Sequence, residues 1–381
     1  MLTQNKIVLE KEVYLDNAAT TKPLPEVVET VHKYLTDEWY NPSSKYPPAL
    51  QVKRDIEQAR KTIADFIGAK PEEIYFTSGA SEANCLAIKG YLERNRGLSL
   101  NLVTSKLEHK SILELLHHLI NTSIYFLSTK QSTGEIKFDE NTLSQMKLKK
   151  RSLVSVQYAN NEIGTIQDMD LISRGCRENG FIFHTDATQA FPHIKFDMSK
   201  NNIDMMSVSG HKFGAPKGIG FLYVRKGFEL APLICGTQEN GMRGGTENVP
   251  YIMGMAKAVE MMNPANECPL ADYFEKNLVT ALGCRINGGS NKLKHIISCT
   301  FPEYVVGDYL IHRLAEDGIY LSAGSACNSY SDTPSTVLDA IGLTHSEIAR
   351  TIRISLSNEI KKEDIDYVLE KMNLICSQLK L

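Results

Sequence analysis

The sequence predicts an α/β fold with a large domain, built on a mostly parallel sheet flanked by helices, and a smaller α+β domain. Apolar strand-like runs alternate with helix-like segments through most of the chain, which is typical of a parallel sheet covered by helices. After about residue 255 this pattern changes. We therefore expect residues 16–255 to form the large domain, and residues 1–15 and 256–381 to form the small one.

Helical spacing of apolar residues predicts a helix over residues 50–68, which Gly68 is placed to end. Residues 74–77 then resemble a strand that turns at Ser78-Gly79 into a helix over residues 80–89. Further strands are expected at five apolar runs, residues 102–104, 153–158, 181–185, 203–208 and 220–224.

The C-terminal part has three local signals. Thr344 and Glu347 have the spacing of a capping box at the start of a helix. Apolar and polar residues alternate around Arg353, which predicts a half-buried strand. The final segment has apolar residues at helical spacing, namely Ile365, Val368, Leu369, Met372 and Ile375.

Composition excludes several classes of protein. The 381 residues include 42 basic and 45 acidic ones with no basic block, so no direct nucleic-acid partner is expected. The N-terminus has no apolar signal core, and the apolar run at residues 112–120 is too short to span a bilayer. The eight cysteines include no Cys-x-x-Cys pair, which argues against a zinc knuckle or a disulfide framework. We expect a cytoplasmic protein without a membrane or metal partner.

Polar side chains that could bind a ligand or take part in a reaction follow the predicted strands. They are Ser81, His109, Asn161, Asp186 and Lys212. In open α/β sheets, ligands bind beyond the carboxyl ends of the strands. All five side chains are therefore expected to line one pocket.

Two motifs point to the chemistry. Lys212 ends the tetrapeptide Ser209-Gly210-His211-Lys212 directly after a predicted strand, where a lysine can form a Schiff base with pyridoxal phosphate (PLP). Cys327 lies in a loop of small residues, at about residues 321–334. Alone, the lysine is more often a surface charge and the cysteine a buried apolar residue. Together they suggest sulfur chemistry on PLP.

The other requirements of PLP have candidates. The turn Ser78-Gly79-Ala80-Ser81 offers N–H groups and hydroxyls for a phosphate, although a plain Ser-capped helix fits it as well. Asp186 can keep the ring nitrogen protonated, or it can be a turn aspartate. His109 can stack on the ring and move protons, and Arg353 can bind a carboxylate, but either can be a surface residue.

Together, these motifs resemble the cysteine desulfurase family of fold-type I PLP enzymes, in the group with the nitrogenase-type and housekeeping iron–sulfur members. The motifs occur in family order through nearly the whole chain. They occupy residues 14–21, 41–44, 76–82, 108–110, 160–164, 186–189, 209–212, 241–248, 325–327 and 352–356.

The resemblance implies a role for each matching position. Lys212 would attach to PLP, His109 would stack on the ring as acid–base, and Cys327 would form the persulfide. The remaining cofactor contacts would come from Asp186 to the ring nitrogen, Gln189 to the ring hydroxyl, and Ala80, Ser81, Ser209 and His211 to the phosphate. Thr246 would reach the partner's phosphate in a homodimer, and Asn161 and Arg353 would hold the substrate carboxylate.

The resemblance implies removal of sulfur from L-cysteine, which gives L-alanine and a Cys327 persulfide for a sulfur-acceptor protein. The acceptor stays open between an iron–sulfur scaffold, a tRNA thiolation protein and a thiamine-pathway carrier. A small-amino-acid aminotransferase or a selenocysteine lyase of the same fold is the nearest alternative, although transamination needs no thiol. A non-catalytic scaffold protein is the alternative from another class.

Overall fold

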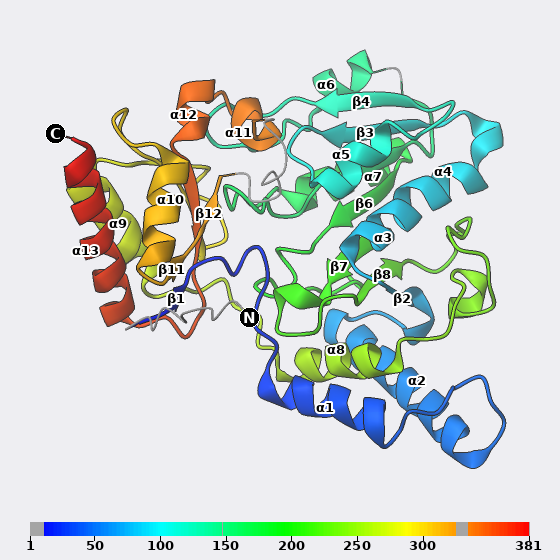
Figure 1. Ribbon diagram of the computed structural model, residues 1–381. Helices are drawn as coiled ribbons and strands as arrows, with labels where there is room; N and C mark the ends of the chain where they lie inside the picture. The colour runs from blue at the N-terminus through cyan, green and yellow to red at the C-terminus, as the bar shows by residue number, and fades with distance from the viewer. Residues whose placement is uncertain (1–10, 147, 325–333, 381) are drawn as a thin grey trace, which may run out of the picture.

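The computed structural model describes residues 11–146, 148–324 and 334–380. Its largest sheet has the strand order β2-β8-β7-β6-β5-β3-β4 (Figure 1). Only β8 runs antiparallel to its neighbours, so the sheet is mostly parallel, as predicted. The strands are β2 (Ile74–Thr77), β3 (Asn101–Ser105), β4 (Ser123–Leu127), β5 (Leu153–Ser155), β6 (Ile182–Asp186), β7 (Met205–Ser209) and β8 (Gly220–Val224).

Both faces of this sheet are buried. In β7, Met206 and Val208 enter one apolar core while Met205 enters another, because successive side chains of a strand point to opposite faces. The first core includes residues of α1 (Pro25–Thr36), α2 (Pro47–Ile67), α7 (Met169–Asn179) and α8 (Val249–Met261). The second includes residues of α3 (Ala80–Cys85), α4 (Tyr91–Arg94) and α5 (Lys110–Leu116). Burial on both faces explains why these strands are apolar runs.

The local predictions were mostly right. Helix α2 starts at Pro47, earlier than expected, and ends where predicted, with Gly68 in the left-handed conformation at φ 66°. The helix expected at residues 80–89 continues through a π-helical turn (Leu86–Gly90) into α4. The run at residues 153–158 forms a shorter strand than expected, and β4 was not foreseen. The short helix α6 (Glu140–Gln145) follows β4.

The C-terminal part forms an antiparallel sheet with the order β12-β13-β10-β9, and helices α9, α10 and α13 gather beside it (Figure 1). Its elements are β9 (Arg285–Asn287), β10 (Ile296–Thr300), β11 (Ile319–Tyr320), β12 (Ser322–Ala323), β13 (Thr351–Ser355), α9 (Ala271–Leu282), α10 (Gly307–Glu316), α11 (Thr336–Ala340), α12 (His345–Ala349) and α13 (Lys362–Leu379). Strand β1 (Val13–Tyr14) pairs with β11, which ties the N-terminal segment to this part. The domain boundaries at residues 15 and 255 stay a prediction.

One expectation for this part was wrong. The alternating strand around Arg353 is β13, and all of its residues are buried rather than half of them. The capping box of Thr344 and Glu347 is present at the start of α12. Across the described residues, no helix combines the length and apolar character needed to cross a bilayer. The same residues contain no cluster of ligand side chains suited to a metal ion.

Candidate active site

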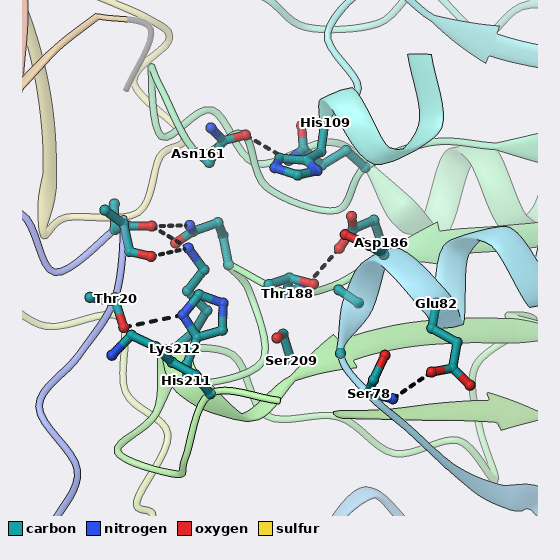
Figure 2. Close-up of a pocket in the computed structure, with 18 of the residues that line it drawn as sticks. Thr20, Ser78, Glu82, His109, Asn161, Asp186, Thr188, Ser209, His211 and Lys212 are labelled. Atoms are coloured by element: carbon teal, nitrogen blue, oxygen red, sulfur yellow. Dashed lines mark hydrogen bonds between the residues drawn. The ribbon is translucent and has the colours of Figure 1, made fainter. Parts of the chain in front are cut away.

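A cavity of about 600 Å³ is lined by side chains that follow the carboxyl ends of the sheet strands (Figure 2). Strand β6 ends at Asp186 and β7 ends at Ser209, and both residues line the cavity. Ser81, His109, Asn161, Asp186 and Lys212 all contribute to the lining, as expected from their positions after the strands. Ala80, Gln189, Ser209, His211 and Arg353 complete the predicted residues that line it.

The turn between β2 and α3 forms one end of the cavity. Ser78, Ala80 and Ser81 line it where the helix begins, so main-chain N–H groups of the first turn lie at the cavity. The Glu82 carboxylate accepts the Ser78 N–H at 2.8 Å and pairs with Arg243 at 2.6 Å. Burial opposes ionisation of Glu82, but the hydrogen bonds from Arg243 and Ser78 lower its pKa. The turn is therefore held by a carboxylate from its own helix.

Lys212 and His211 follow β7 in a short helical turn. The Lys212 Nζ donates to the carbonyl oxygens of Ala18 at 2.5 Å and Ala19 at 2.8 Å. The His211 Nδ1 lies 3.2 Å from the Thr20 hydroxyl. Burial, together with the nearby Lys212, lowers the pKa of His211 to about 4, so its ring is neutral at pH 7.

Asp186 is a buried carboxylate in the lining, with 3 % of its surface exposed. Its Oδ1 accepts the Thr188 N–H at 3.0 Å, and its Oδ2 accepts the Asn84 amide at 2.7 Å. Gln189 lines the cavity too, and its Nε2 donates to the Ala18 carbonyl at 2.8 Å. A fixed carboxylate of this kind suits a protonated heterocyclic nitrogen.

Arg353 is the largest fully buried side chain at the site, with 2 % of its surface exposed. It reaches the cavity from β13 and donates to the Asn161 carbonyl oxygen at 3.0 Å. Within the described part of the chain, its buried Nε has no hydrogen-bond partner. The Asn161 Oδ1 accepts from Gln157 at 3.2 Å. A buried guanidinium with an unused donor suits a small carboxylate.

Among the described residues predicted for the site, Thr246 does not line this cavity. Thr246 lines a smaller neighbouring cavity of about 210 Å³, which shares Ser78 and Gly218 with the larger one. Cys327 lies outside the described residues. Sequence reasoning missed Asn84, which bonds Asp186 from inside a helix. Its position one helical turn after Ser81 is the only local signal for it.

The donor set fits PLP. Lysine, buried carboxylate and arginine line one cavity, and the N–H groups and hydroxyls of a strand-to-helix turn lie at its end. The turn could hold a phosphate, and Ser209 and His211 could add donors to it. Lys212 could form the covalent link, and Asp186 could face the ring nitrogen.

Comparison with known proteins agrees with this fit. The family model described as Aminotransferase class-V matches residues 13–368. A cysteine desulfurase IscS of Methanosarcina thermophila is 40% identical, with 99% of this chain and 95% of the relative covered. One from Dictyoglomus turgidum is 39% identical, with 98% and 96% covered.

Solved structures give the same result. A "NifS-like protein" superposes with a TM-score of 0.86 at 32% identity, covering 97% of this chain and 100% of that one. The structure titled "SspA in complex with cysteine" has a TM-score of 0.80 at 38% identity, with 90% and 98% covered. These likenesses confirm the predicted fold-type I architecture. The chain belongs to the aminotransferase class-V family and, within it, to the PLP-dependent cysteine desulfurases.

Proposed function

We propose that the residues of this cavity carry out cysteine desulfurase chemistry, which converts L-cysteine to L-alanine and leaves the sulfur as a persulfide on Cys327. The observation that carries the proposal is the presence of Lys212, Asp186 and Arg353 in the lining of one cavity. Relatives named cysteine desulfurase that match nearly the whole chain support the activity, and a neighbouring structure titled as a complex with cysteine supports the substrate.

In this proposal, Lys212 links PLP and Asp186 pairs with its ring nitrogen, while Gln189 faces the ring hydroxyl. The phosphate contacts are Ala80, Ser81, Ser209 and His211. Bound PLP supplies an electron sink for bonds at the substrate α-carbon. The charge on Asp186 maintains that property, because it keeps the ring nitrogen protonated.

Arg353 and Asn161 hold the substrate carboxylate, and this orients the substrate sulfur. His109 stacks on the ring and holds a proton at the cavity. The Cys327 thiolate attacks the substrate sulfur, so a sulfur–sulfur bond forms as the carbon–sulfur bond breaks. The α-amino acid leaves as alanine with a proton on its former CH₂ carbon. Sulfur then moves to an acceptor protein.

Covalent attachment tests the central assignment. Borohydride reduction of the wild type should fix PLP to the peptide that contains Lys212, as mass spectrometry would show. Lys212→Ala should lose this adduct, whereas Lys217→Ala is the matched control, because Lys217 lines the same cavity. An adduct that persists in Lys212→Ala would remove Lys212 from the role.

Cys327→Ser tests the sulfur step. The variant should load PLP and bind cysteine, but it should form neither alanine nor a persulfide at this position, because a serine hydroxyl is a poor sulfur acceptor. The other cysteines are internal controls in the peptide map. Keto-acid production without sulfide would instead favour an aminotransferase, and protein without a PLP absorbance band would favour the scaffold alternative.

The assembly belongs to the same proposal. We expect a cytoplasmic homodimer in which Thr246 reaches the partner's phosphate. Thr246 is exposed in a cavity next to the turn Ser78-Gly79-Ala80-Ser81, the proposed phosphate turn, and this supports the assignment. Light scattering should give twice the mass of the chain, and Thr246→Ala should release PLP faster than Thr246→Ser. The acceptor protein can be an iron–sulfur scaffold or a thiolation carrier, and co-purification with the persulfide-loaded protein would identify it.

A further inference from the structure

A chain of hydrogen bonds connects Asp186 to His109 behind the cavity. The Asn84 Nδ2 lies 2.7 Å from Asp186 Oδ2 and 3.0 Å from the Ser111 Oγ. The Ser111 Oγ lies 2.9 Å from the His109 Nδ1. Asn84 lies on α3 and is fully buried, at 0 % exposure. Its amide therefore contacts one cavity residue, Asp186, directly and a second, His109, through Ser111.

Chemistry fixes the direction of these bonds. The short contact with the Asp186 carboxylate must come from the amide NH₂ of Asn84, because its oxygen would be repelled there. The second N–H of the same group then donates to Ser111 Oγ. Since that oxygen accepts from Asn84, its own proton is available for the His109 Nδ1.

The main chain confirms which His109 nitrogen accepts. The Ser111 N–H, at the start of α5, donates to the His109 Nδ1 at 3.1 Å, and a main-chain N–H can only donate. The Nδ1 therefore carries a lone pair. A neutral His109 ring must hold its proton on Nε2.

The cost of burying Asn84 indicates that its donors matter. Within the described part of the chain, its Oδ1 is buried and has no hydrogen-bond partner. An unsatisfied buried carbonyl lowers stability, and an apolar side chain of similar size would avoid this cost. Simple packing in the core does not account for this amide.

We propose that Asn84 is a positioning residue that holds Asp186 directly and His109 through Ser111, and that this arrangement, together with the Ser111 main-chain N–H, keeps the neutral His109 ring in the Nε2–H form. The inference deepens the proposed function, on which its catalytic part rests. It assigns the proton that His109 can present at the cavity to Nε2. It also predicts that a substitution at either end of this series of hydrogen bonds alters the positions of both Asp186 and His109.

The first test needs neither cofactor nor turnover. Protein with ¹⁵N-labelled histidine and no PLP should show the His109 signals of a protonated Nε2 and an unprotonated Nδ1, assigned by their loss in His109→Gln. A proton on Nδ1 in the neutral ring would overturn the proposal. Because this readout is independent of PLP, it separates the inference from failure of the proposed function.

The second test asks whether Asn84 and Ser111 act through the same series of hydrogen bonds. Asn84→Ala and Ser111→Ala should each lower kcat about tenfold, with little change in KM for cysteine, and Ser111→Thr should restore it because the hydroxyl returns. The kcat of the double variant should be little lower than that of Asn84→Ala alone. Once Asn84 is replaced, the Ser111 hydroxyl no longer connects His109 to Asp186, so its removal has little further effect.

A matched control distinguishes positioning from stability. Ser111 is partly buried, and Ser152 is a serine that is more deeply buried, at 0 % exposure. The Ser152 hydroxyl bonds Asn101 and the Lys149 carbonyl rather than His109. Ser152→Ala should lower the melting temperature without changing kcat or the His109 signals. Losses that multiply in the Asn84 and Ser111 double variant, or wild-type kcat in Ser111→Ala, would contradict the proposal.

Discussion

Arg353 and Asp16 form an ion pair between the C-terminal sheet and the N-terminal segment, with 2.7 Å between Nη2 and Oδ1. The Arg353 side chain is 2 % exposed and that of Asp16 is 20 % exposed. The Arg353 guanidinium therefore has a carboxylate partner within the protein, and a bound substrate carboxylate would use its remaining N–H groups. Asp16 keeps the buried charge neutralised when no substrate is present.

Asp16→Asn should leave that charge without a counter-ion. We expect the free energy of unfolding to fall by about 2–3 kcal/mol, less than for a fully buried pair because Asp16 retains some contact with water. L-Alanine, the proposed product, would supply a replacement carboxylate. It should therefore raise the melting temperature of the Asp16→Asn holoenzyme more than that of the wild type.

Asp317 supplies the control for this prediction. It pairs with Lys371 at 2.9 Å, and both side chains are about a third exposed, at 31% and 26%. Asp317→Asn should change stability by less than about 1 kcal/mol and should not alter the response to alanine. An equal alanine effect in wild type and Asp16→Asn would argue against the role of Asp16.

Glu108 should make the protein lose stability as the pH rises from about 4.3 to about 8. Burial, with a smaller contribution from the Asp186 charge, raises the pKa of Glu108 to about 8, although the Ser105 hydrogen bond opposes this. The folded protein therefore binds this proton more tightly than the unfolded chain, whose Glu pKa is about 4.3. The resulting stability is fully present below about pH 4.3 and is lost as the pH rises to about 8.

Glu108→Gln tests this sign, because glutamine stays neutral. Between about pH 5 and about pH 8, the free energy of unfolding of the variant should fall less than that of the wild type. Chemical denaturation over this range gives the comparison. Glu178→Gln, at an exposed position, is the control, and its free energy of unfolding should change with pH as that of the wild type does. Parallel curves for Glu108→Gln and wild type would show that Glu108 is ionised in the fold.

The sequence pattern predicted the central helices and strands because the residues that define them form a regular apolar pattern or lie at the ends of the element. Helix α2 has a regular apolar face and a glycine at its end, and β8 is an apolar run with the bounds predicted. Strand β4 was missed because it lies at the sheet edge with mixed exposure and no clear period. Strand β13 was taken as half-buried because Arg353 looks solvent-facing until its partner Asp16, 337 positions away, is known.

The cavity residues could be predicted because they follow strands whose carboxyl ends meet at one edge of the sheet. Asn84 and Ser111 could not, since they lie within helices and their roles depend on contacts 102 and 27 positions apart. Asn84 resembles any buried polar residue in a helix. Only the direction of its amide toward Asp186 distinguishes it.

The Arg60–Glu239 pair should stabilise the loop that carries Thr246. Arg60, on α2, makes two bonds to the Glu239 carboxylate, at 2.7 and 2.9 Å, and Glu239 also accepts the Phe76 N–H at 2.8 Å. Glu239→Gln should lower the free energy of unfolding by about 2 kcal/mol, because it removes the buried partner of the Arg60 guanidinium and leaves only the exposed Glu57 carboxylate, 3.4 Å away. Glu229→Gln breaks the exposed pair with Arg94 and should change little. Equal effects of the two variants in thermal denaturation would contradict this account.

Gly220→Ala should weaken PLP binding through the phosphate turn. Gly220 lies opposite both Thr77 and Ser209 in the sheet, and an added Cβ would stand 2.4 Å from the Val208 carbonyl oxygen and 2.8 Å from the Gly79 Cα. Both obstacles are main-chain atoms, so β8 and the turn at Gly79 must separate. We expect a loss of about 1–3 kcal/mol in stability and a smaller rise in melting temperature when PLP is added. Gly97→Ala is the control, because nothing lies within 4 Å of the position that its methyl group would take. If Gly220→Ala lowers stability but keeps the full PLP-dependent rise, the turn holds its shape independently of β8.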